Sequence, residues 1–134
     1  MPAPCPFEYA IVRVVPHVER EEFVNAGAIV FCEAHDFLSA RISLNETRLV
    51  ALAPDVDLAL VRRHLDAIPR ICEGGPLGGP IGRLTTRERW QWLVAPRSTI
   101  LQTSPPHVGL TEDPMAWLER LLDHVVRASS HPLP

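Results

Sequence analysis

Three short runs rich in β-branched and aromatic residues, separated by only a few polar residues, constrain the fold of this chain most strongly. They cover residues 7–15, 24–33 and 37–44, and each has the length and composition of a β-strand. Parallel neighbours need a crossover connection of about a dozen residues or more, which these short connections do not provide. The three runs therefore predict an antiparallel meander.

The first run is apolar on both of its alternating faces, which predicts a central strand. Arg13 is a charge on one of these faces and needs a partner if it is buried. That partner is either an internal carboxylate or a ligand. In the second run, Gly27 indicates a bulge or a close approach of another backbone segment.

Two amphipathic helices are expected to complete the fold. Asp55 or Asp57 can cap the first, and Pro69 predicts that it kinks or ends near Ile68. The second begins at Asp113 with a proline in its first turn, and its buried stripe is Met115, Leu118, Leu121, Leu122 and Val125. The prediction is an α+β fold, with an antiparallel sheet of about five strands and two main helices packed on it.

The region between the two helices combines several local signals. Residues 74–82 hold five glycines and two prolines, typical of a linker or lid or, less specifically, of a phosphate-cradling loop. Thr85 or Thr86, with Glu88, predicts a capping box and a short helical turn over residues 86–90. Trp90 and Trp92 follow at strand-like spacing, available for core packing or for stacking on a ligand. Residues 99–103 then predict another strand.

Residues 97–99 are the main candidate for a binding site. A guanidinium and two hydroxyls in succession suit a phosphate, carboxylate or similar oxyanion. Gln102 would extend this site along the strand, and His107 would reach its mouth. The alternative is a turn whose hydroxyls bond their own backbone, while Arg97 pairs with one of the glutamates at 19, 21 and 22.

All 13 basic residues are arginine, and the chain has no lysine. This excludes Schiff-base chemistry on a lysine and the lysine of a P-loop, so any bound anion must be held by guanidinium, hydroxyl or backbone groups. The net charge of -3 argues against a broad nucleic-acid surface. Residues 83–97 contain four arginines and one glutamate. This local excess of positive charge indicates either a solvated helix face or an extension of the candidate site.

Three cysteines without a CxxC pair predict neither a disulfide framework nor a thiolate zinc site. The histidines form no strong metal pattern, so no metal and no cofactor are expected. No signal peptide and no membrane-spanning run are recognised. These features predict a cytoplasmic protein that does not enter a membrane. The expected domain covers residues 7–128, between disordered tails at residues 1–6 and 129–134.

A resemblance to a known family rests on three segments, YAIVRVVPHVEREEFVNAGAIVFC, GGPIG and ERWQWLVAPRSTILQTSPPHVGL. They resemble a bacterial family described only as a domain of unknown function (three-zero-three-seven). The resemblance implies a small cytosolic protein without an assigned activity, encoded beside HipA-like kinase genes of the toxin-antitoxin type. The positions that match the family's hallmark segments are Arg13, Glu22, Asn25, Gly27, Gly82, Arg97, Ser98, Thr99, Gln102 and His107.

Two functions are expected from these residues. The leading hypothesis is a non-enzymatic accessory or binding module that acts with a protein partner, a HipA-like kinase by resemblance, and holds a small anionic ligand at Arg97. The alternative is an enzyme acting on a phosphate-bearing or nucleotide substrate. It requires Arg13, Glu22, Arg97 and His107 to converge in one pocket.

Overall fold

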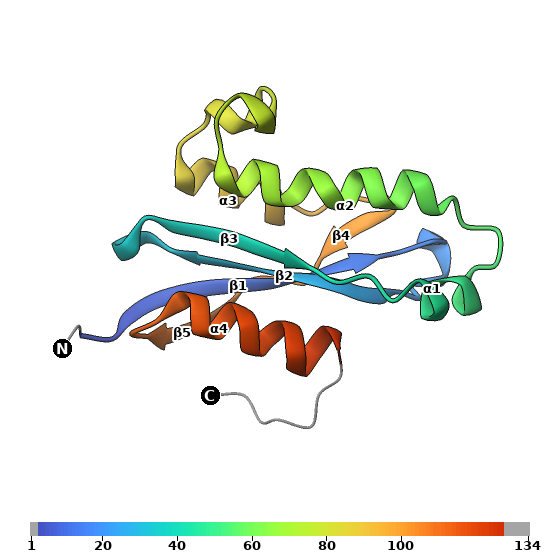
Figure 1. Ribbon diagram of the computed structural model, residues 1–134, viewed down its shortest axis with the longest axis horizontal. Helices are drawn as coiled ribbons and strands as arrows, with labels where there is room; N and C mark the ends of the chain where they lie inside the picture. Colours follow the sequence, from blue (N-terminus) through green and yellow to red (C-terminus); the bar gives the residue numbers. More distant parts are fainter. Residues whose placement is uncertain (1–2, 128–134) are drawn as a thin grey trace.

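A single antiparallel sheet organises the computed structural model, which describes residues 3–127 (Figure 1). The strand order is β3-β2-β1-β4, and β5 also pairs with β1. The predicted meander and the α+β class are confirmed. The strands are β1 (Cys5–Val14), β2 (Val24–Cys32), β3 (Phe37–Ile42), β4 (Leu101–Thr103) and β5 (His107–Thr111).

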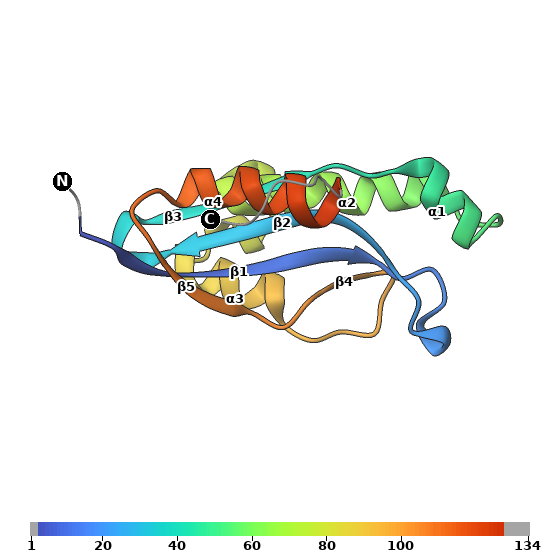
Figure 2. The same cartoon turned by 90° about the horizontal axis from the view of Figure 1, so that it is seen from below.

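Helices cover both faces of the sheet, as Figures 1 and 2 show. The long helix α2 lies across one face with α3, and α4 lies across the other. A short helix, α1, precedes α2 and was not predicted. The helices are α1 (Glu46–Leu52), α2 (Leu58–Glu73), α3 (Thr86–Val94) and α4 (Pro114–Leu121), and a π-type turn (Leu122–Val126) continues α4.

This arrangement gives the sheet two apolar cores. Alternate residues of β1 point to opposite faces, so Ala10, Val12 and Val14 pack under α2 and α3, while Phe7 and Ile11 pack under α4. The middle strand β2 is therefore buried along almost its entire length. Each large apolar side chain buried in these cores contributes about 1.5–3 kcal/mol to stability.

The two strands at the β1 edge behave as one strand with a break. β4 pairs with residues 12–14 of β1, and β5 pairs with residues 5–9. Ser104 lies at the break, where its amide donates to Ile11 O (2.8 Å) and its hydroxyl accepts from Ile11 N (2.9 Å). Ser104 thus keeps the buried backbone of β1 bonded where the two prolines interrupt the pairing. β5 was not predicted, because those prolines indicate the end of a strand.

The first predicted helix is confirmed, and of the two outcomes expected at Pro69, a kink or an end near Ile68, the end is wrong. Asp57 caps α2 by accepting from Leu60 N (3.1 Å), and the helix continues through Pro69 to Glu73. Ile71 and Cys72, on the far side of the proline, are buried in the core. Their burial outweighs the hydrogen bond that a proline removes inside a helix.

The tryptophans at strand-like spacing belong to a helix. Thr85 and Glu88 form the predicted capping box, and the helix that it starts continues to Val94 instead of ending after one turn. Adding residues to a started helix is easier than nucleating one. The helical path separates the two rings, because Trp90 is 2% exposed and stacks on Phe31, whereas Trp92 is 37% exposed.

In the C-terminal helix the predicted cap at Asp113 is confirmed, since it accepts from Ala116 N (3.2 Å). The predicted stripe is correct at Leu118, Leu121 and Leu122 and wrong at Met115, which is exposed. The π-type turn adds one residue to the last turn and shifts the helical phase. Val126 is consequently buried, and Val125 only partly so.

The first strand begins at Cys5, two residues before the predicted domain boundary, because β5 provides a partner for Cys5 and Pro6. Residues 1–2 and 128–134, which include the predicted C-terminal tail, lie outside the described residues.

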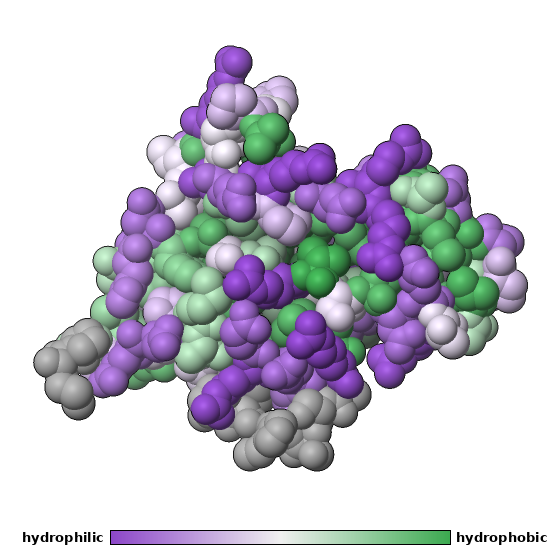
Figure 3. Space-filling model, viewed as in Figure 1, coloured by the Kyte–Doolittle hydropathy of each residue, from purple (hydrophilic) through white to green (hydrophobic). Residues whose placement is uncertain are grey.

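Figure 3 shows mainly hydrophilic side chains on one face, with hydrophobic ones between α2 and α4 and near α1. Within residues 3–127, no helix has the length and apolar character needed to cross a membrane.

Candidate functional site

Three of the predicted site residues lie in one row across the sheet. Arg13 on β1 is opposite Asn25 on β2 and opposite Gln102 on β4. The register shifts between Val12 and Arg13, close to Gly27, which confirms the predicted irregularity. A Cβ on Gly27 would lie 2.6 Å from Arg41 O, so the neighbouring backbone leaves no room for a side chain there.

Arg13 and Asn25 each carry a buried polar atom without a hydrogen-bond partner among the described residues, namely Arg13 Nε and Asn25 Oδ1. The predicted internal ion pair of Arg13 is not formed with any described carboxylate. Instead its guanidinium carbon lies 4.2 Å from the centre of the Phe23 ring. Asn25 Nδ2 donates to Val125 O (3.4 Å). Paired positions of β1 and β2 therefore carry a buried donor and a buried acceptor that have no partner within residues 3–127.

Arg97 follows α3 and faces its C-terminal end. Its Nη2 donates to Trp92 O, one of the carbonyls that a helix end leaves unbonded. Its guanidinium carbon lies 4.4 Å from the centre of the Trp92 ring. The predicted pairing of Arg97 with Glu19, Glu21 or Glu22 is not present. Arg97 therefore caps a helix with one N–H and keeps further donors for other contacts.

The residues after Arg97 partly follow the turn interpretation. Thr99 Oγ1 donates to Leu101 O (2.8 Å), and Gln102 Nε2 donates to Thr99 O (3.1 Å). These bonds fix the entry into β4 and occupy part of the hydrogen-bonding capacity that a ligand would need. The Ser98 side chain is exposed.

Two cavities meet at Arg97. The first, which we name the arginine cavity, has a volume of about 510 Å³ and brings Arg13 and Arg97 to one space. Ser98 and Gln102 supply neutral polar groups to its wall, and Glu21 supplies a carboxylate. The apolar part of the wall is formed by Val15, Val18 and Phe23.

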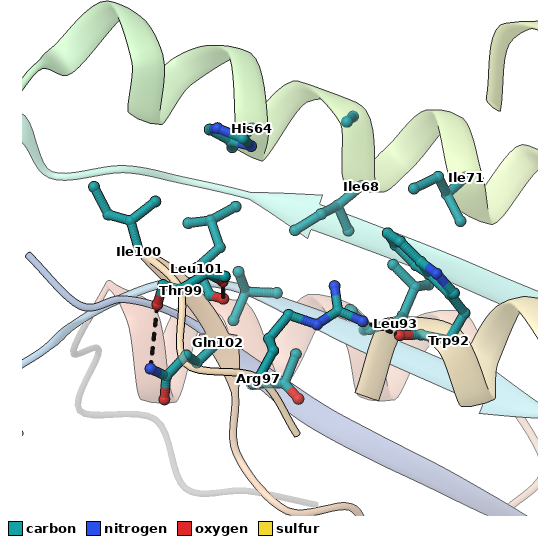
Figure 4. Close-up of a pocket in the computed structure, with 14 residues that line it drawn as sticks. His64, Ile68, Ile71, Trp92, Leu93, Arg97, Thr99, Ile100, Leu101 and Gln102 are labelled. Carbon is teal, nitrogen blue, oxygen red and sulfur yellow. Dashed lines mark hydrogen bonds between the residues drawn. The ribbon is translucent and has the colours of Figure 1, made fainter. Parts of the chain in front are cut away.

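The second cavity, which we name the apolar cavity, has a volume of about 420 Å³ and lies between α2, the end of α3 and β4 (Figure 4). Arg97 and Gln102 line this cavity as well as the first. Successive turns of α2 form one wall with His64, Ala67, Ile68 and Ile71, and Trp92, Leu93 and residues 99–103 form the other. The predicted helix stripe identified Ile68 but not the space beside it.

Neither Glu22 nor His107 lines either cavity, although Glu22 lies between Glu21 and Phe23, which line the arginine cavity. Glu22 is exposed before β2. His107 begins β5, where its ring stacks on Tyr9 with the centres 5.1 Å apart. The convergence required for the enzyme alternative is thus met by Arg13 and Arg97 alone.

Arg89 is a buried residue that the sequence analysis did not identify. It is 9% exposed, contrary to a solvated position among the arginines of residues 83–97. Its Nη1 donates to Ile71 O (2.9 Å) and Cys72 O (2.5 Å), and its Nε donates to Leu84 O (3.1 Å). The guanidinium therefore closes the C-terminal end of α2.

The glycine-rich segment folds against Arg89 and is tightly bonded to itself. The amides of all five of its glycines donate to carbonyls within residues 70–82, including Gly75 N to Gly82 O (2.8 Å). These bonds leave no glycine amide for a phosphate. A Cβ on Gly82 would fall on Gly75 O, so the position requires glycine.

Groups with shifted pKa values occur where Arg89 contacts the C-terminal end of α2 and also on the surface. Burial raises the pKa of the Cys72 thiol to about 12, which makes it a packing residue rather than a nucleophile. On the surface, hydrogen bonding and charge from Arg87 lower the pKa of Glu33. Arg87 Nη2 and Glu33 Oε2 are 2.5 Å apart. Within residues 3–127, no group of three or more histidine, cysteine or acidic side chains is arranged to hold a metal ion.

Comparison with known proteins identifies a family and no described relative. No curated protein and no solved structure gives a significant match. A family model described as a protein of unknown function (DUF3037) matches residues 9–126, which include the second half of β1, all the later strands and the residues that line both cavities. The chain therefore belongs to the DUF3037 family.

Proposed function

We propose that this protein is a non-enzymatic binding module that recognises a protein partner through an anionic group held between Arg13 and Arg97. The observation that carries the proposal is the arginine cavity, where two arginines from distant parts of the chain line one space. Arginine binds carboxylate and phosphate groups through paired hydrogen bonds. This geometry therefore favours an anion.

The environment of Arg13 supports this assignment. Its Nε is buried and unbonded among the described residues, and a buried donor without a partner costs about 1–3 kcal/mol. An anion at this position would recover that cost. The Phe23 ring beside the guanidinium limits its motion, so less side-chain freedom is lost when a ligand binds.

Glu21 opposes the anion, because its side chain lines the same cavity. It is exposed, and solvent weakens its repulsion. Replacing it by glutamine should tighten anion binding by about twofold. The carboxylate would also disfavour ligands that carry several negative charges, which favours a single carboxylate or phosphate on a partner.

The partner and the compartment are further parts of the proposal. The family resemblance suggests a HipA-like kinase as the partner. The cysteines at 5, 32 and 72 are free thiols, which supports a reducing cytoplasm. Purification of the two proteins together should give a complex, and its absence at micromolar concentrations would contradict this partner.

The anion site itself is tested by titrating sulfate into the protein and following backbone amide signals by NMR. Arg13→Gln and Arg97→Gln should each weaken sulfate binding about tenfold or more, because each removes one of the two cations. Arg48→Gln is the matched control, since it removes the same charge from an exposed position on α1. Equal weakening in all three variants would show a nonspecific charge effect and contradict the site.

A further inference from the structure

We infer that the partner segment is amphipathic, with a large apolar side chain that enters the apolar cavity and an acidic side chain, one or two residues away, that binds Arg13 and Arg97. This inference rests on the proposed function, because it uses the same arginine cavity. It adds the apolar cavity as a second subsite and defines the chemistry of the segment that the protein recognises.

The apolar cavity has the dimensions and walls of a binding pocket. Its volume of about 420 Å³ falls within the range of roughly 300–1,000 Å³ found for ligand sites. Ile68, Ile71 and Leu93 provide aliphatic surface. Trp92 adds an aromatic ring that is 37% exposed. Large apolar and aromatic side chains are the usual anchors of protein interfaces and fill pockets of this kind.

The two cavities are joined by shared residues. Arg97 and Gln102 line both, and Figure 4 shows the Arg97 side chain extending from the β4 side toward Trp92. Consecutive Cα atoms of a peptide are about 3.8 Å apart. Neighbouring or next-nearest residues of one bound segment can therefore reach both sides of Arg97.

Charge selects an acidic segment over a basic or neutral one. Arg97 and His64 line the apolar cavity, and no carboxylate belongs to a described residue of its wall. Arg13 adds a second cation across the shared boundary. An apolar anchor flanked by a carboxylate therefore matches both the surface and the charge of the combined site.

Four short peptides test the inference through the ligand. They are the acetylated and amidated dipeptides tryptophan-glutamate, tryptophan-glutamine, alanine-glutamate and alanine-glutamine, each titrated into the full chain and followed by NMR. Tryptophan-glutamate should bind most tightly. Replacing its tryptophan by alanine should weaken binding about tenfold or more, and replacing its glutamate by glutamine should weaken it about fivefold or more.

Two protein variants locate the subsites. Ala67→Phe fills the apolar cavity from α2 and should reduce the tryptophan-to-alanine effect to less than about twofold, while sulfate binding is retained. Arg13→Gln should remove the glutamate-to-glutamine effect. If Ala67→Phe does not fold, Trp92→Ala replaces it, because it removes the partly exposed aromatic wall of the apolar cavity. The Trp92 ring also lies 4.4 Å from the Arg97 guanidinium carbon, so sulfate binding is measured on the same variant to separate the loss of the wall from a change at Arg97.

The outcomes separate this inference from the proposed function. Sulfate binding that depends on Arg13, together with peptides that bind equally with tryptophan or alanine, would overturn the second subsite and leave the anion site intact. Absence of sulfate binding to the wild-type protein would overturn both the anion site and the second subsite. Peptide shifts confined to residues away from α2 and β4 would also overturn the inference.

Discussion

Arg89 and Arg97 lie on either side of the C-terminal turns of α3, and both donate hydrogen bonds to carbonyls at the end of a helix. Arg89 is buried and bonds the end of α2 and the loop before α3. Arg97 is half-buried, donates to Trp92 O alone among residues 3–127 and lines two cavities. The same side chain thus serves architecture where its donors are engaged, and under the proposed function it serves recognition where donors are left over.

The largest expected effect comes from removing the engaged arginine. Arg89→Leu leaves the Ile71 and Cys72 carbonyls without their buried donor and should lower the free energy of unfolding by about 3 kcal/mol or more. Urea denaturation measures the change. Arg87→Gln, two residues earlier on an exposed face of α3, is the control and should have a far smaller effect. A small decrease in the free energy of unfolding of Arg89→Leu would contradict the structural role assigned to Arg89.

The glycine loop beside Arg89 should be the next most sensitive region. Gly82→Ala places a methyl group on the Gly75 carbonyl and should destabilise the protein by about 2 kcal/mol. Gly75→Ala is the matched control. Its φ of 78° and ψ of -166° form a backbone conformation that essentially only glycine adopts, although no atom lies within 4 Å of the added Cβ, so backbone strain alone should cost about 1–3 kcal/mol. Thermal unfolding measures both variants, and a Gly82→Ala variant as stable as the wild type would contradict the close packing of the loop.

The burial of this junction also predicts a pH dependence. The pKa of Cys72 is raised from its ordinary value near 9 to about 12 in the folded protein. Above about pH 9 the unfolded chain loses this proton first, so stability is full below that pH and is lost between about pH 9 and 12. Over that range the slope should be about 1.4 kcal/mol per pH unit steeper in the wild type than in Cys72→Ala. Equal slopes of stability against pH in the wild type and in Cys72→Ala would contradict the burial of the Cys72 thiol.

The smallest effect on stability is expected for Arg97. Arg97→Gln removes one hydrogen bond to a helix end and should lower the free energy of unfolding by less than about 1 kcal/mol, although it should weaken sulfate binding about tenfold. Denaturation and sulfate titration on the same sample measure both quantities. A large loss of stability would assign Arg97 to the architecture, together with Arg89.

Elements whose formation depends on neighbouring residues could be predicted from the sequence. The composition and length of residues 7–15, 24–33 and 37–44 identified the first three strands. Three helix starts were marked by Asp55 or Asp57, by Thr85 or Thr86, and by Asp113. In each case the cause and the structure lie within a few residues of one another. β5 was not predicted, because Pro105 and Pro106 indicate the end of a strand, whereas β5 forms by pairing with the distant residues 5–9 of β1.

The candidate site was predictable only in part for the same reason. Arg13, Asn25 and Gln102 were singled out separately, but their alignment in one row depends on the pairing of three strands. The apolar cavity depends on the gap between α2 and β4, and the burial of Arg89 depends on where α2 ends. Ala67, a small residue beside Ile68, was a weak local sign of that gap.

The most direct test of the difference between the arginines follows their Nε–H signals by NMR during a phosphate titration. We expect the signals of Arg13 and Arg97 to shift together and to saturate at the same phosphate concentration, while the signal of Arg89 stays unchanged because its donors are engaged. Parallel, unsaturated shifts of all exposed arginines, or no shift at Arg13, would contradict an anion site between Arg13 and Arg97.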